Sequence, residues 1–290
     1  MTGRLRIVAG IDLGPETERV VSYAALFAGA MHTAVRLFYV IDYVLTPPAY
    51  LAEYVEEEKK REGAEMEGWK VRLQREGIDA EYGLAFGRLH ESFVRVIEDS
   101  GPILLVIGYS SHVLRPSSSE RLIRSLKSQM LVVRGRAAAG AAIGSVRVKR
   151  ILCPVDFSEN SKKAAVAAKE YASLLSASLH LMHVIPSHII KGKRLLWKQI
   201  REGDREKFDA AVREEAKSRL ASFCSDMKIE GEGVVCEGHP GEAISSVAEE
   251  GGYDLIVTGA RGLSYIESVL IGSTTDAVLK SSPCPVLIIH

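Results

Sequence analysis

A group of glycines and hydroxyls near the C-terminus has the residue types and spacing of an anion site. The group consists of Gly259 and Gly262, which follow the apolar run 254–258, and of Gly272 directly before Ser273, Thr274 and Thr275. Glycine permits a positive φ and lets backbone N–H groups approach a ligand with no Cβ in between. A helix that begins at the hydroxyls would add its free N–H groups. The spacing therefore predicts a phosphate cradle.

Two common phosphate-binding motifs are missing from the chain. No GxxxxGK[ST] sequence occurs, so a Walker A loop is excluded. The one GxG sequence, GEG at 231–233, enters a strand instead of opening a helix, which is the wrong context for a dinucleotide fingerprint. The cradle must be of another kind.

The chain contains an internal duplication. RIVAGIDLGPETE at 6–18 matches RILCPVDFSENSK at 150–162, and Asp12 and Asp156 lie 144 residues apart. ILLVIGYSS at 103–111 matches DLIVTGARG at 254–262 with an offset of 151, and a longer polar insertion after residue 186 absorbs the difference. One duplication explains these matches. The predicted domains are 1–136 and 147–290, joined by an Ala- and Gly-rich linker at 137–146.

Each copy alternates apolar strands with amphipathic helices. In the second copy we expect strands at 148–155, 178–185, 232–237, 254–259 and 285–290. Helices are expected from Ser158, which can cap the first of them, to 175, and at 204–228, 241–250 and 274–281. Continuous apolar strands separated by helices indicate a parallel sheet covered on both faces, so each domain is predicted to be a doubly wound α/β sheet. Ligands bind such sheets beyond the carboxyl ends of the strands, where Gly259 lies.

Composition favours a cytoplasmic protein that does not bind nucleic acid. Lys and Arg total 37, as do Asp and Glu, and the charges divide evenly between the halves. The 4 cysteines show no metal-ligand spacing, which favours reduced thiols. Neither a signal peptide nor an apolar run of membrane-spanning length is found, so we expect no membrane insertion.

Several separated motifs together resemble the universal stress protein family in its tandem form. They are the spacing G-x2-G-x9-G-[ST] from Gly259, PVDFS at 154–158, LMHVI at 181–185 and CPVLII at 284–289. The resemblance covers nearly all of both halves and implies five mainly parallel strands in each, in the order 3-2-1-4-5, the adenine nucleotide alpha hydrolase-like arrangement. It also implies that the two fifth strands pair to form an intramolecular pseudo-dimer, and a homodimer is a further possible assembly.

The resemblance also implies a ligand, because the ATP-binding branch of the family carries this glycine motif. The second half would bind ATP or AMP, with Mg²⁺ as an optional companion of the phosphates. Asp156 would contact the ribose or the adenine, and the Val184 backbone would read the adenine edge. The other implied contacts are Pro154, Thr258, Gly259, Ala260, Arg261 and Gly262, and, at the phosphates, Gly272, Ser273, Thr274 and Thr275.

The first half departs from this pattern. Gly108 is kept, but Ser111 stands where the second glycine is needed, and SSSER at 117–121 replaces Gly-Ser. Arg115 and Arg121 could hold an anion or could be solvated surface charges. We expect one nucleotide site per chain, in the second half.

The expected function is a nucleotide-dependent regulatory module for unknown protein partners, with no catalytic residue assigned. A slow ATPase or nucleotidyl-transfer enzyme is one alternative, in which Asp156 holds Mg²⁺ and His239 orients water. A nucleotide-independent scaffold is the other. Local pattern alone leaves open whether Asp156 caps a helix or binds a ligand, and it favours a core position for His183.

Overall fold

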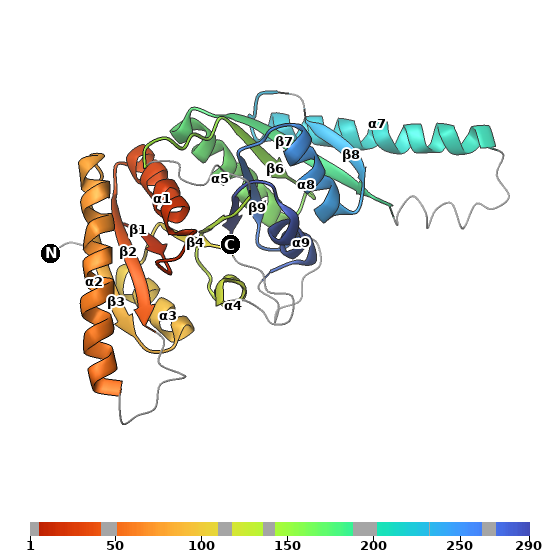
Figure 1. Ribbon diagram of the computed structural model, residues 1–290. Helices are drawn as coiled ribbons and strands as arrows, with labels where there is room; N and C mark the ends of the chain where they lie inside the picture. The colour runs from red at the N-terminus through yellow and green to blue at the C-terminus, as the bar shows by residue number, and fades with distance from the viewer. Residues whose placement is uncertain are drawn as a thin grey trace. The chain divides into compact units, whose positions relative to one another are not determined.

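The computed structural model divides into two compact units, residues 1–147 and 148–290. It describes residues 6–41, 51–109, 118–135, 143–187, 202–231, 233–262 and 271–290. The predicted linker falls mostly on residues outside these ranges. Each unit is an α/β domain (Figure 1).

The first unit contains a parallel sheet in the order β3-β2-β1-β4-β5. Its strands are β1 (Arg6–Gly10), β2 (Ala34–Ile41), β3 (Ala80–Phe86), β4 (Leu104–Gly108) and β5 (Met130–Val133). Its helices are α1 (Thr17–Met31), α2 (Leu51–Arg75), α3 (Leu89–Ser100) and α4 (Ser118–Ser125). This is the strand order 3-2-1-4-5 that the family resemblance implies.

The second unit repeats that topology as β8-β7-β6-β9-β10, again with parallel strands. Its strands are β6 (Arg150–Pro154), β7 (Ser178–Pro186), β8 (Val234–Gly238), β9 (Leu255–Gly259) and β10 (Val286–Ile289). Its helices are α5 (Glu159–Leu175), α7 (Glu202–Asp226), α8 (Pro240–Glu250) and α9 (Ser273–Ser281). The pseudo-dimer and the homodimer stay predictions.

The strands are continuous apolar runs because helices bury them on both faces. Within the second unit, Ile151, Leu152 and 255–257 are fully buried, as are 286–288. Helix α5 packs against β6, β7 and β9, α7 packs against β7 and β8, and α8 contacts β7, β8 and α9. This layering is the reason for the missing polar alternation in the strand sequences.

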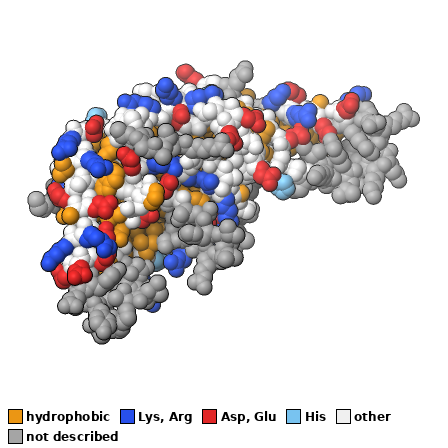
Figure 2. Space-filling view, viewed as in Figure 1, with side chains coloured by type: hydrophobic (Ala, Val, Ile, Leu, Met, Phe, Trp, Pro, Cys, Tyr) orange, Lys and Arg blue, Asp and Glu red, His pale blue; other side chains and the backbone are white. Residues whose placement is uncertain are grey.

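Helix α2 is rich in charged residues and covers the sheet of the first unit at β2 and β3. Met66 and Leu73 are fully buried, and Gly63 lies over Leu84 of β3. The buried side of the helix also includes Glu58 and Glu62, both of which pair with Arg61. On the face that Figure 2 shows, basic and acidic side chains are interspersed instead of being gathered by sign.

Candidate functional site

Asp156 lies at the carboxyl edge of the second sheet, just after β6 ends at Pro154. Its Oδ1 accepts hydrogen bonds from the N–H of Ser158 at 3.1 Å and from the Ser158 hydroxyl at 2.6 Å. Ser158 is then the N-cap of α5, and its Oγ accepts from the N–H of Ser161 at 3.2 Å. The predicted capping role of Ser158 is confirmed. Asp156 supports the turn that leads to the cap through its Oδ1.

The second carboxylate oxygen of Asp156 faces Gly262. A Cβ added at Gly262 would clash with Oδ2 of Asp156, so the backbone of this loop approaches the carboxylate more closely than any side chain permits. Gly259 is similarly tight, because an added Cβ would lie 3.0 Å from the Asn160 carbonyl oxygen of α5. Both glycines are therefore required for close approach.

These glycines do not use the positive φ that glycine permits. Neither Gly259 nor Gly262 has a left-handed φ, and Gly272 has φ −71° and ψ 158°, which is ordinary extended backbone. An added Cβ at Gly272 would make only van der Waals contacts, the nearest at 3.5 Å from the Cα of Arg261. The motif consists of two glycines that the fold itself needs and a third that the fold does not need.

Helix α9 begins at the same edge of the sheet. Gly272 is its N-cap and has no side-chain cap, and its N–H donates to the Ala260 carbonyl at 2.8 Å. The first intrahelical bond runs from Asp276 N–H to the Gly272 carbonyl at 2.9 Å. The N–H groups of Ser273, Thr274 and Thr275 precede that bond, so they form the polar end of the helix. Ser273 is exposed and Thr274 is partly exposed.

Two of the hydroxyls predicted to contact the ligand form hydrogen bonds within the domain instead. The Thr275 hydroxyl, on a residue that is 3% exposed, donates to the Gly259 carbonyl at 2.8 Å. The Thr258 hydroxyl, also buried, donates to the same carbonyl at 3.3 Å. Because a hydroxyl has one hydrogen to donate, Thr275 can offer an anion only its N–H. The expected help from hydroxyls is thus restricted to Ser273 and Thr274.

Close packing between α8 and α9 fixes where α9 begins. A Cβ at Gly241 of α8 would clash with the Cβ of Ala277 of α9. One turn further on, the hydroxyls of Ser245 and Ser281 lie 2.7 Å apart. Small residues at both contacts bring the two helices close together, so the N-terminus of α9 is held against a rigid neighbour.

The Val184 backbone faces the gap left by the end of β6. Pro154 lies opposite Met182, and the Val155 N–H donates to the Met182 carbonyl at 2.7 Å. Residues two apart in a strand direct their N–H and C=O groups to the same side, so those of Val184 point past the end of β6. The Val184 side chain is itself buried.

The other predicted contacts border this edge. Ala260 is buried, and its N–H donates to the Ile289 carbonyl at 2.7 Å. Arg261 and Gly262 follow it and are partly exposed. The structure therefore gathers the ends of β6 and β9, the start of α9 and the backbone of β7 at one edge of the sheet.

His183 has a backbone partner but is partly buried instead of lying in the core, and His239 lies at the start of a helix. The Nδ1 atom of His183 lies 2.8 Å from the Val155 carbonyl oxygen, and burial lowers the pKa of its imidazole. His239 is the exposed N-cap residue of α8. Sequence reasoning missed Phe157, a non-glycine residue with φ 65° beside Asp156, and only the short spacing between Asp156 and Ser158 hints at such a turn.

The first unit repeats the aspartate turn but not the rest of the site. Oδ1 of Asp12 accepts from the Gly14 N–H at 2.9 Å, as Asp156 does from Ser158. The residue equivalent to Ala260 is Tyr109, which donates from its hydroxyl to Glu120 of α4 at 3.0 Å. The Arg134 guanidinium lies over the Tyr109 ring, 5.1 Å from its centroid. The second unit has the small Ala260 at the position of Tyr109, and Ser111 and Arg115 lie outside the described residues.

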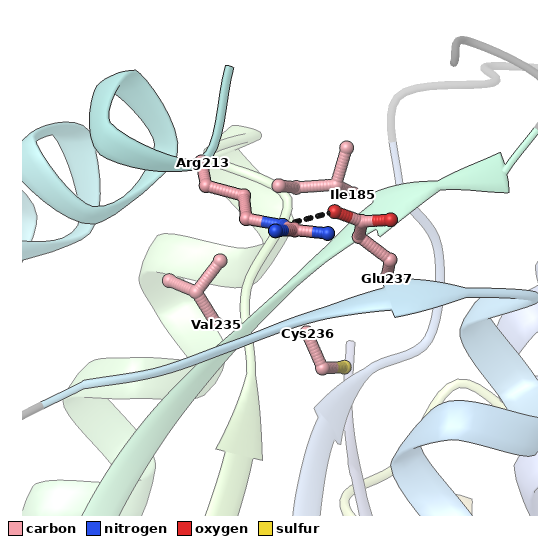
Figure 3. Close-up of a pocket in the computed structure, with 5 residues that line it drawn as sticks. All are labelled: Ile185, Arg213, Val235, Cys236 and Glu237. Atoms are coloured by element: carbon pink, nitrogen blue, oxygen red, sulfur yellow. Dashed lines mark hydrogen bonds and ion pairs between the residues drawn. The ribbon is translucent and has the colours of Figure 1, made fainter. Parts of the chain in front are cut away.

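A separate shallow hollow of about 220 Å³ lies between α7 and the neighbouring strands (Figure 3). It is lined by Ile185, Arg213, Val235, Cys236 and Glu237, and Arg213 reaches from α7 to pair with Glu237 of β8. None of these is a predicted site residue.

In the ranges that the structure describes, no three His, Cys, Asp or Glu side chains group as metal ligands, and no helix has the length and apolar character to cross a membrane.

Comparison of the sequence with known protein families identifies the class of protein to which the chain belongs. The profile of the universal stress protein family matches residues 3–134 and again 147–290, so the chain belongs to that family, with two of its domains in tandem. This confirms the resemblance seen in the motifs.

Individual relatives agree with the family assignment. Universal stress protein MJ0577 of Methanocaldococcus jannaschii is 31% identical over 157 residues, which are 50% of this chain and 96% of that protein. Universal stress protein YxiE of Bacillus subtilis is 30% identical over 157 residues, 49% of this chain and 98% of that protein. The crystal structure of a universal stress protein from Archaeoglobus fulgidus has a TM-score of 0.70 at 18% identity and covers 98% of this chain and 96% of its own, which supports the fold.

Proposed function

We propose that the second domain binds one adenine nucleotide, ATP or AMP, at the carboxyl edge of its sheet. The chain would act as a regulatory module whose surface, as seen by partner proteins, depends on that nucleotide. The observation that carries this proposal is the approach of the Gly262 backbone to the Asp156 carboxylate beside the open N-terminus of α9. Because Gly262 and Gly272 have no side chain, a phosphorylated ligand could approach the backbone N–H groups there.

The residues of this edge fit the parts of a nucleotide. The N–H and C=O groups of Val184 offer the donor and acceptor pair that a base edge requires. Asp156 offers a carboxylate oxygen to a hydroxyl of ribose or to an amino group. The N–H groups of residues 273–275 and the hydroxyls of Ser273 and Thr274 would hold phosphate, and Mg²⁺ would enter with the phosphates.

The fit is specific to the second domain. Position 260 is a buried alanine there, whereas its counterpart Tyr109 in the first domain carries a large side chain whose hydroxyl donates to Glu120. We therefore expect a stoichiometry of one nucleotide per chain.

The test is to denature the purified full chain and count the released adenine nucleotide by chromatography and mass spectrometry. Gly272→Val is the informative variant, because φ −71° and ψ 158° suit valine while its branches would cover the N–H groups of α9. Gly68→Ala, with open space around the new methyl group on α2, is the matched control.

We expect about one nucleotide per chain in the wild type and in Gly68→Ala, and none in Gly272→Val. The phosphate state found identifies the ligand. If the wild type carries none, and added ATP or AMP leaves its melting temperature unchanged, the proposal is wrong and the glycine motif is a structural turn.

A further inference from the structure

Phe157 adopts a backbone conformation that a bulky residue rarely takes. Its φ is 65°, in the left-handed region, where side chains other than Gly, Asn and Asp are uncommon. The equivalent residue of the first domain, Leu13, has φ 55°. Both copies of the duplication thus keep this turn without a glycine, so the surrounding structure must enforce it.

The turn at Phe157 determines how the Asp156 carboxylate is presented. It brings the N–H and the hydroxyl of Ser158 back onto Oδ1 of Asp156, at 3.1 Å and 2.6 Å. With Oδ1 held in this way, Oδ2 is directed to the backbone of Gly262. A change of φ at Phe157 would release Ser158 and let the carboxylate rotate.

Side chains from β7 and α7 hold the Phe157 ring on several sides. The His183 ring of β7 lies against it at a tilt of 38°, with centroids 4.5 Å apart. Two α7 residues complete the contact: Phe223 meets it edge to face at 5.6 Å, and the Arg219 guanidinium lies 4.3 Å from the ring centroid. Arg219 is otherwise exposed, so the cluster joins the surface of α7 to the turn beside Asp156.

We propose that Phe157 is a positioning residue that couples helix α7 to the nucleotide site through Asp156. This inference rests on the proposed nucleotide site and adds a regulatory surface to it. A partner or a change that moves Arg219 or Phe223 alters the orientation of Asp156 and hence the affinity for nucleotide. By linkage, bound nucleotide must stabilise the part of α7 that packs on Phe157.

Phe157→Leu tests the coupling, with Leu13→Ala in the first domain as the control. Leucine is accepted at this φ in the first domain, so the variant removes the ring contacts while keeping a residue that the turn tolerates. Affinity for AMP and ATP is measured by calorimetry in the wild type, in Phe157→Leu, Leu13→Ala and Asp156→Ala, and in Phe157→Leu combined with Asp156→Ala. Thermal unfolding checks that each variant folds.

The expected loss of affinity for Phe157→Leu is about tenfold, shrinking to less than about twofold when Asp156 is already alanine, because coupled residues are not additive. Leu13→Ala should leave the affinity unchanged. An equal loss in both backgrounds, or no loss at all, overturns the coupling while leaving the nucleotide site intact. Absence of binding by the wild type refutes the nucleotide site itself, and the coupling with it.

Amide hydrogen exchange provides a second readout that does not depend on weak binding. Adding AMP or ATP to the wild type should slow exchange over residues 219–226 of α7, whereas Phe157→Leu saturated with the same nucleotide should show little slowing. If the exchange rates of α7 in the wild type are the same with and without nucleotide, the inference is overturned.

Discussion

Replacing Gly262 with alanine tests the central contact of the site. The new Cβ would clash with Oδ2 of Asp156, and the carboxylate cannot turn away freely because Oδ1 is held by the N–H and hydroxyl of Ser158. Either the carboxylate gives up one of these bonds or the loop moves away from it. A hydrogen bond to a charged group contributes about 1.5–3 kcal/mol, so the free energy of unfolding of the second domain should fall by about that amount.

The same displacement should weaken nucleotide binding. A loss of about 1.4 kcal/mol corresponds to a factor of ten, so AMP and ATP should bind Gly262→Ala at least about tenfold more weakly. Urea unfolding measures the stability and calorimetry the affinity. The stability control is Gly272→Ala, because its methyl group would lie 3.5 Å from the nearest atom, so its unfolding free energy should stay within about 0.5 kcal/mol of the wild type.

The result that refutes this reasoning is a Gly262→Ala protein with wild-type stability and wild-type affinity. Such a protein would show that the carboxylate moves at no cost and that its orientation does not matter to the ligand. Lower stability with unchanged affinity would assign Asp156 to the turn alone.

Three further predictions concern stability. Gly241→Ala should lower the free energy of unfolding by about 1–3 kcal/mol in urea titration, because the added methyl group overlaps Ala277 and forces α8 and α9 apart. Gly68→Ala should raise it by about 0.5–1 kcal/mol in the same titration, since alanine replaces an exposed glycine within α2. Burial lowers the pKa of His183 from 6.5, so the unfolded chain binds its proton more readily than the folded one. The contribution of His183 to stability should therefore be complete above about pH 6.5 and should decline as the pH falls through the folded pKa, and urea midpoints at pH 7.5 and 5.5 should differ less in His183→Gln.

Much of the fold could be predicted because it depends on repeated patterns. The 144-residue offset between Asp12 and Asp156 revealed the duplication, and the buried strands read as continuous apolar runs. Ser158 was recognisable as a helix cap because the capping signal lies within a few residues of chain.

The details of the site were beyond sequence reasoning because they depend on residues far apart in the chain. Gly262 is required because Asp156 lies opposite it, and no local pattern shows that pairing. The Thr275 hydroxyl resembled a phosphate ligand until its partner, the Gly259 carbonyl, was placed. Phe157 went unnoticed because the rings that contact it, His183 of β7 and Phe223 of α7, lie far from it in the chain.

The aspartate turn at Asp12 shows what the duplication has retained. Asp12 accepts a hydrogen bond from the Gly14 N–H, just as Asp156 accepts one from the Ser158 N–H. The turn is the same although the first domain has Tyr109 where the second has Ala260. The aspartate therefore forms the same kind of turn in both domains, and its presence alone does not distinguish them. The two domains differ instead at the residue after the fourth strand, where Ala260 corresponds to Tyr109, and at Gly262, which corresponds to Ser111.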